Sequence, residues 1–79
     1  MAYAKTEEEW GRRAADHLKA EMKKAEVTYA EMVKRLKKHG LQETEASIAN
    51  KISRGTFSAT FLLASLKAIE ADVVRLETV

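Results

Sequence analysis

The chain has 79 residues, which is enough for one small domain. Its formal net charge of +2 is weak evidence for a polyanionic partner. The absence of cysteine excludes disulfide frameworks, zinc–thiolate sites and thiol nucleophiles, and the absence of proline excludes collagen-like and linker-like chains. With 46% hydrophobic and 33% charged residues, the sequence is typical of a soluble globular domain whose small core favours association with a second copy.

The first predicted element is a helix between Glu7 and Ala25. Apolar residues recur there at intervals of three or four, which places on one helical face Trp10, Ala14, Leu18, Met22 and Ala25. Acidic residues at positions 7–9 suit the positive end of the helix dipole. We expect Trp10 and the two phenylalanines to anchor the core.

A second helix is predicted over about residues 29–39. Thr28 is placed to act as its N-cap, and Glu31 follows three positions later to complete a capping box. Gly40 is placed to end the helix, because glycine readily adopts the left-handed conformation found after a C-cap.

A third helix is predicted over about residues 45–54. Thr44 is a plausible N-cap and Gly55 is the expected stop signal. Ile48 and Ile52 are one turn apart, and we expect both to point into the core.

A fourth helix is predicted to follow its N-cap, Ser58, and to reach about Ala71. Residues 73–79 are rich in β-branched side chains and alternate in polarity, so a short strand competes there with a frayed helix. A lone strand needs a partner, which a second copy of the chain would supply. The predicted fold class is all-α, with four to five short helices and the short C-terminal strand as an open alternative.

No apolar run approaches the roughly 18–20 residues that a membrane-spanning helix needs. The acidic start, residues 1–9, is unlike a signal peptide. We therefore expect a cytoplasmic protein that does not associate with membranes.

Positive charge is concentrated in the middle third of the chain. Residues 28–55 hold six basic and three acidic side chains, whereas residues 1–27 hold six of each and residues 56–79 hold two basic and three acidic. Because attraction to phosphates is local and independent of sequence, a polyanion would prefer the middle third. A lysine-rich solvated helix face explains the same pattern, so charge alone leaves both interpretations open.

The third predicted helix carries a continuous polar stripe at helical spacing, formed by Thr44, Ser47, Asn50, Lys51 and Arg54. Asparagine can form two hydrogen bonds to adenine, arginine or lysine can read guanine, and hydroxyls can serve bases or phosphates. The exposed face of any small bundle could look similar. The preceding capped helix and glycine-containing turn, however, favour a helix-turn-helix arrangement.

Residues 28–55, followed by a polar loop and an apolar fourth helix, resemble the Cro/C1-repressor type of helix-turn-helix domain. The resemblance rests on residues 28–36 of the second helix and residues 52–55 at the close of the third, and it extends over residues 12–71. Residues 44–58 are also similar to a group of short uncharacterised bacterial proteins usually placed beside that family.

The sequence departs from the family pattern at two places. The connection over residues 37–43 is longer than the family's tight turn, and Ser53 stands where the family usually has glutamate.

The resemblance implies that residues 1–79 form a single helix-turn-helix domain that binds double-stranded DNA, with the third helix in the major groove. The base-reading residues that it implies are Thr44, Ser47, Asn50 and Lys51. The phosphate contacts that it implies are Thr28, Tyr29, Lys51, Arg54, Thr56 and Ser58. It further implies a bacterial, nucleoid-associated transcriptional regulator, such as a repressor.

Other chemistry has little support in the sequence. His17 and Glu21 lie one turn apart, but a metal site needs more ligands. No glycine-rich phosphate loop or strained nucleophile turn is present. We therefore expect no catalytic residues, metal, cofactor or enzyme activity, and no small-molecule effector site is evident.

We expect a homodimer that is formed through the C-terminal segment and part of the fourth helix. Leu63, Val74 and Leu76 fall outside the main core face and are the predicted dimer contact. Two alternatives to a specific regulator stay open. One is a protein-interaction module or antitoxin-like partner without DNA binding, and the other is a low-specificity, nucleoid-type DNA binder.

Overall fold

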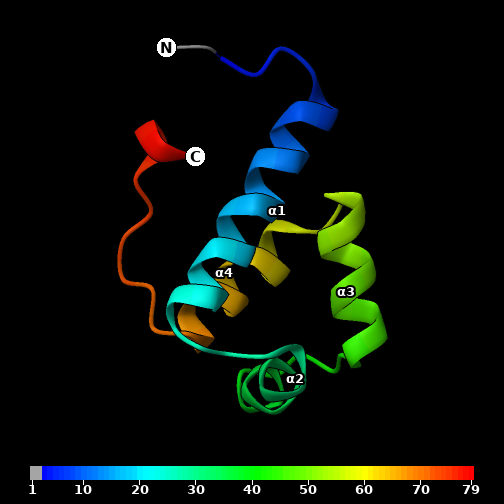
Figure 1. Cartoon of the computed structure of the whole chain (residues 1–79). Coiled ribbons are helices and arrows are strands. Elements are labelled where there is room, and N and C mark those ends of the chain that lie inside the picture. Colours follow the sequence, from blue (N-terminus) through cyan, green and yellow to red (C-terminus); the bar gives the residue numbers. More distant parts are fainter. Residues whose placement is uncertain (1–2) are drawn as a thin grey trace.

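The computed structural model describes residues 3–79, which form the four helices α1 (Glu7–Lys24), α2 (Tyr29–Lys38), α3 (Glu45–Arg54) and α4 (Ala59–Ala68). A short 3-10 helix, η1 (Leu76–Thr78), follows them. No strand forms within residues 3–79, so the described fold is all-α, as the sequence predicts. α1 and α2 each pack against both α3 and α4. In Figure 1, α2 is seen nearly end-on while α3 runs across the view, so these two helices cross steeply.

Each of the four α-helices begins at a hydroxyl side chain that accepts a hydrogen bond from the backbone N–H three residues later. These N-caps are Thr6, Thr28, Thr44 and Ser58. The capping box predicted at α2 forms only in part, because the Glu31 carboxylate lies 3.5 Å from Nε of Arg35 instead of returning to the cap. A complete capping box stands at the start of α3.

Three helices end in the same pattern. One residue has a left-handed backbone conformation, and the N–H of the next residue donates a hydrogen bond to the carbonyl oxygen five residues earlier. These bonds measure 2.9 Å each and join Val27 to Met22, Leu41 to Leu36 and Ala71 to Leu66. Gly40 takes the left-handed position after α2, but Glu26 and Glu70 take it after α1 and α4, with φ of 58° and 60°. Left-handed backbone costs a residue with a side chain about 1–2 kcal/mol, so these two ends are strained.

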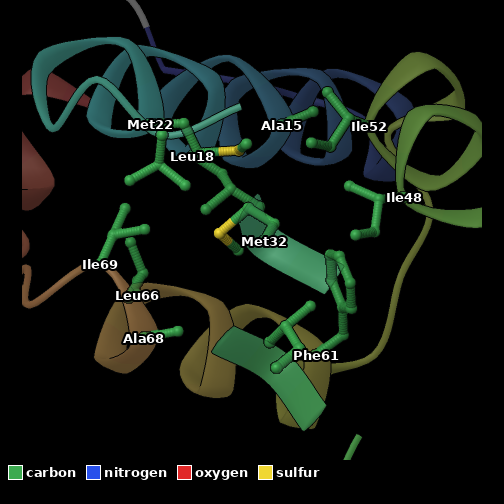
Figure 2. Close-up of a cluster of buried hydrophobic side chains, with 12 residues drawn as sticks. Ala15, Leu18, Met22, Met32, Ile48, Ile52, Phe61, Leu66, Ala68 and Ile69 are labelled. Atoms are coloured by element: carbon green, nitrogen blue, oxygen red, sulfur yellow. The ribbon is translucent and has the colours of Figure 1, made fainter. Parts of the chain in front are cut away.

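The core is one cluster of buried apolar side chains from all four α-helices and from the residues that follow α1 and α4 (Figure 2). Its members are Ala15, Leu18, Met22, Val27, Met32, Leu36, Ile48, Ile52, Phe61, Leu66, Ala68 and Ile69. Met32 of α2 lies near the middle of this cluster and is fully buried. Ile48 and Ile52 are the α3 members, so the opposite side of α3 faces solvent.

The inward face of α1 includes Leu18 and Met22, as predicted, but it continues towards the N-terminus through Ala15 and not through Ala14 and Trp10. Its buried residues are Ala15, Leu18 and Met22. Trp10 is 49% exposed, so the expectation that it anchors the core is wrong, although Phe61 is buried as expected. Next to Trp10, it is Gly11 that lies where α1 meets the end of α3. The Trp10 ring lies instead beside Arg13, whose guanidinium carbon is 5.7 Å from the ring centroid.

Residues 72–79 turn back along α1 after α4 ends (Figure 1). This segment and α1 border a hollow of about 630 Å³, which is lined on the α1 side by His17 and Glu21. The C-terminal strand that competed with a helix in the sequence does not form in this single chain, because no second strand is present within residues 3–79 to pair with it. The 3-10 turn η1 forms there instead.

Candidate nucleic-acid interface

A contact between two glycines fixes α3 against α1. A Cβ atom at Gly11 of α1 would lie 2.2 Å from the carbonyl oxygen of Gly55, the C-cap of α3, so only glycine fits at position 11. Gly55 is left-handed, with φ of 69°, and a Cβ atom there would lie 3.0 Å from the Gly11 carbonyl. The two helices therefore meet through direct backbone packing.

Arg12, the next residue of α1, binds the last turn of α3. Its guanidinium donates hydrogen bonds to the carbonyl oxygens of Ser53 at 2.5 Å and Ile52 at 3.4 Å. Carbonyls in the last turn of a helix lack intrahelical partners, and a cation is favoured at that end of the dipole. Arg12 thus anchors the C-terminal end of α3.

A capping box closes the N-terminal end of α3. The Thr44 hydroxyl accepts from the Ser47 N–H at 3.0 Å, and the Ser47 hydroxyl accepts from the Thr44 N–H at 2.9 Å. These are two of the predicted base-reading residues. The structure brings them together at the helix start, where both hydroxyls stabilise α3 itself.

Glu43, the residue before Thr44, accepts hydrogen bonds from two side chains of α3. The Ser47 hydroxyl donates a 2.6 Å hydrogen bond to one carboxylate oxygen, and Lys51 Nζ lies 2.5 Å from the other. The Glu43 side chain is only 8% exposed, and the Lys51 ammonium also lies 4.7 Å from the Phe61 ring centroid. Burial raises the pKa of Glu43, but the hydrogen bonds from Lys51 and Ser47 and the charge of Lys51 outweigh burial and hold this pKa below its usual value.

The outward face of α3 is rotated relative to the predicted stripe. Ile48 and Ile52 are buried and mark the inward side of α3. Since successive residues of an α-helix are about 100° apart around its axis, Asn50 lies at the centre of the outward side. The exposed residues on that side are Ala46, Asn50, Ser53 and Arg54. Glu45 is exposed too, but it lies about 140° around the helix from Asn50.

The stripe predicted from the sequence includes only half of this face. It contains Asn50 and Arg54 but not Ala46 and Ser53, whose exposure follows from the positions of Ile48 and Ile52 on the opposite side of the helix. The prediction also missed Glu43, which precedes the helix and lies eight positions from Lys51.

Two of the predicted phosphate contacts lie at the start of α2. The Thr28 hydroxyl caps the helix, and Tyr29 beside it is half-buried. Both residues line a hollow of about 560 Å³, which also contains Lys19, Lys23 and Asp16 of α1. The backbone N–H groups of a helix N-terminus favour an anion, and the charged side chains around this one are two lysines, one aspartate and Glu31 in the first turn.

The remaining predicted phosphate contacts lie at the connection from α3 to α4. Thr56 is exposed in this loop. The Ser58 hydroxyl accepts from the Phe61 N–H at 3.1 Å and shares a 2.8 Å hydrogen bond with the Thr60 hydroxyl. Thr28 and Ser58 are thus the caps of two different helices, and the predicted phosphate contacts do not form one cluster.

The basic residues of α2 fall into two groups. Lys34, Lys37 and Lys38 are exposed, as a general electrostatic field requires. Arg35 turns inward, where it donates a 3.1 Å hydrogen bond to the carbonyl oxygen of Ala68 at the end of α4.

The three predicted dimer residues are accessible in the single chain. Leu63 on α4 is 67% exposed, Val74 in the C-terminal segment is 40% exposed and Leu76 in η1 is 82% exposed. Exposed large apolar side chains are a feature of association surfaces when they gather in patches.

Within residues 3–79, no group of three or more histidine, aspartate or glutamate side chains converges to hold a metal ion. His17 borders the hollow under the C-terminal segment, and its buried Nε2 atom makes no hydrogen bond. None of the helices in residues 3–79 has both the length and the apolar character of a membrane span.

Comparison with known proteins gives one family. Residues 10–74 match the family described as a domain of unknown function, DUF6471, and this match includes most of α1 and all of α2, α3 and α4. The chain matches no curated protein and no solved structure. Because this match spans most of the length of the chain, the chain belongs to the DUF6471 family.

Proposed function

We propose that this protein is a small homodimeric transcriptional regulator that binds double-stranded DNA sequence-specifically, with α3 in the major groove. One observation carries the proposal: the exposed side of α3 presents Asn50 at its centre and Arg54 at its end, on a helix that is fixed at both termini. A rigid helix with an uncharged donor–acceptor at its centre suits direct reading of base edges.

The side chains around Asn50 support this proposal. Ala46 and Ser53 are small, so the helix backbone can approach the groove floor closely. An asparagine amide can bond the N6 and N7 atoms of adenine together, and Arg54 can reach a guanine or a phosphate.

The arrangement of α2 and α3 also supports it. The two helices pack on one another and cross steeply, as in a helix-turn-helix (Figure 1). The resemblance of residues 28–55 to the Cro/C1-repressor type points to the same use. In such domains, the N-terminus of the helix before the recognition helix lies near the DNA backbone, and Thr28 and Tyr29 are the matching residues here.

We place the dimer contact on Leu63, Val74 and Leu76. A two-fold axis through this surface would present two α3 helices to one side of a duplex. Half-sites about 34 Å apart, one helical turn, would then be read by one dimer.

The proposal is tested by selecting binding sites from random duplex DNA with the purified protein. A recovered palindrome supports both the function and the symmetry. Asn50→Ala should then weaken binding to the selected site by about 30-fold and leave random duplex almost unaffected. Gln42→Ala, which removes an exposed amide outside α3, is the matched control and should change neither affinity.

Two other results would point elsewhere. Binding that is equal for all duplexes, and unaffected by Asn50→Ala, would indicate a nucleoid-type binder. An absence of duplex binding together with a stable protein complex would indicate an interaction module, for which exposed Leu63 and Leu76 are the candidate surface.

A further inference from the structure

The two cations of α3 lie in different surroundings. Arg54 is exposed in the last turn, and no ion pair or hydrogen bond engages its side chain within residues 3–79. Lys51 is bonded to Glu43 and rests on the ring of Phe61. Only one of the two is therefore available to a ligand without losing an existing partner.

The bond between Glu43 and Lys51 is not an ordinary surface ion pair. The Glu43 side chain is 8% exposed, and each of its carboxylate oxygens accepts from a different α3 side chain, Ser47 on one and Lys51 on the other. Withdrawing Lys51 would leave the partly buried Glu43 carboxylate with only the Ser47 hydrogen bond, which costs more than breaking a fully exposed pair. A phosphate group would have to compete with this carboxylate for the lysine.

We propose that Glu43 is a positioning residue that withholds Lys51 from phosphate groups, so that α3 brings one free cation to DNA instead of two. This inference rests on the proposed function, and it names the residue that sets how strongly α3 attracts phosphate independently of sequence. Each free cation that meets a phosphate releases counterions and steepens the salt dependence of binding. An internal partner for Lys51 therefore lowers this general attraction without altering the base-reading centre at Asn50.

The test compares Glu43→Gln with a matched control, Glu45→Gln. Both variants remove one negative charge next to or within α3, but Glu45 is exposed and engages no α3 cation within residues 3–79. The slope of log affinity against log salt is measured on random duplex DNA. Glu43→Gln should steepen it by about 0.9 per protomer and tighten binding about five-fold near 100 mM salt. Glu45→Gln should leave the slope close to that of the wild type.

Lys51→Met tests the same idea from the other side. If Lys51 is already neutralised, this variant keeps the wild-type slope, and the double variant Glu43→Gln/Lys51→Met returns to that slope. The inference is overturned if Lys51→Met alone flattens the slope by about 0.9 per protomer, or if Glu43→Gln behaves like Glu45→Gln. Circular dichroism identifies the folded variants, and either single variant, when folded, decides the question.

Heparin chromatography separates this inference from the proposed function, because heparin is a polyanion that requires no base recognition. Glu43→Gln should elute at higher salt than Glu45→Gln even if the protein binds no duplex. Co-elution of the two variants contradicts the role of Glu43, whereas a lack of duplex binding by the wild type contradicts the proposed function alone.

Discussion

α3 and α4 are built alike but expose different surfaces. Both are ten residues long, both start at a hydroxyl N-cap, and an arginine from another helix binds the last carbonyls of each, Arg12 for α3 and Arg35 for α4. Yet α3 turns Asn50 to solvent, whereas α4 turns Leu63 outward. The same local construction thus supports one polar face, which we propose binds DNA, and one apolar face, which we propose contacts a second copy.

The largest expected effect comes from the contact that only α3 has. Gly11→Ala places a Cβ atom against the Gly55 carbonyl, and since both groups are backbone, α1 and α3 must separate. We expect a loss of about 3 kcal/mol in the free energy of unfolding, measured in urea. Gly40→Ala is the control: its Cβ meets open space and only its left-handed φ is strained, so about 1 kcal/mol should be lost. Equal losses would show that the close approach of α1 and α3 is not what fixes α3.

The next effect concerns the exposed face of α4. Leu63→Ser should weaken self-association by about 1.5 kcal/mol, because a buried leucine side chain at a contact contributes roughly this much. Sedimentation equilibrium measures this change, and Tyr3→Ser, at another exposed apolar residue, should leave association unchanged. Unaltered self-association in Leu63→Ser would remove α4 from the dimer contact.

A smaller effect distinguishes the two arginine anchors. Arg12→Met and Arg35→Met should each lower stability by about 1 kcal/mol, since both guanidiniums are partly solvated. Only Arg12→Met should reduce discrimination between selected and random duplex, because only Arg12 holds the proposed recognition helix. Equal effects on discrimination would contradict the separate roles of α3 and α4.

The smallest effect is a gain. Glu26→Gly and Glu70→Gly relieve left-handed backbone after α1 and α4, and each should raise stability by about 0.5 kcal/mol, because the flexibility of glycine in the unfolded chain offsets part of the relief. Thermal unfolding at equal protein concentration measures the gain. Lys24→Gly, within the last turn of α1, is the control and should instead lower stability by about 1 kcal/mol.

The sequence predicts most of the local structure of this protein. Helix starts at Thr28, Thr44 and Ser58 and stops at Gly40 and Gly55 are visible because capping depends on residues within one turn of each other. The ends at Glu26 and Glu70 are not visible in the sequence, because glutamate is an unusual residue for left-handed backbone.

The candidate site is less predictable because its geometry is set between elements. Trp10 is exposed while its neighbour Gly11 contacts Gly55, a residue far away in the chain, and local helical spacing does not reveal such a contact. The ion pair between Glu43 and Lys51 joins a loop residue to a residue within α3. The spacing rules for side-chain pairs apply within one helix, so they do not predict this pair.

The most direct test of the central claim is an NMR titration of the labelled protein with a selected duplex, following each backbone amide. We predict the largest shifts from Ala46 to Arg54 and at the start of α2, with α4 around Leu63 unchanged. Shifts confined to α4 and the C-terminal segment, with the amides of α3 unmoved, would contradict the assignment of α3 as the DNA-reading helix.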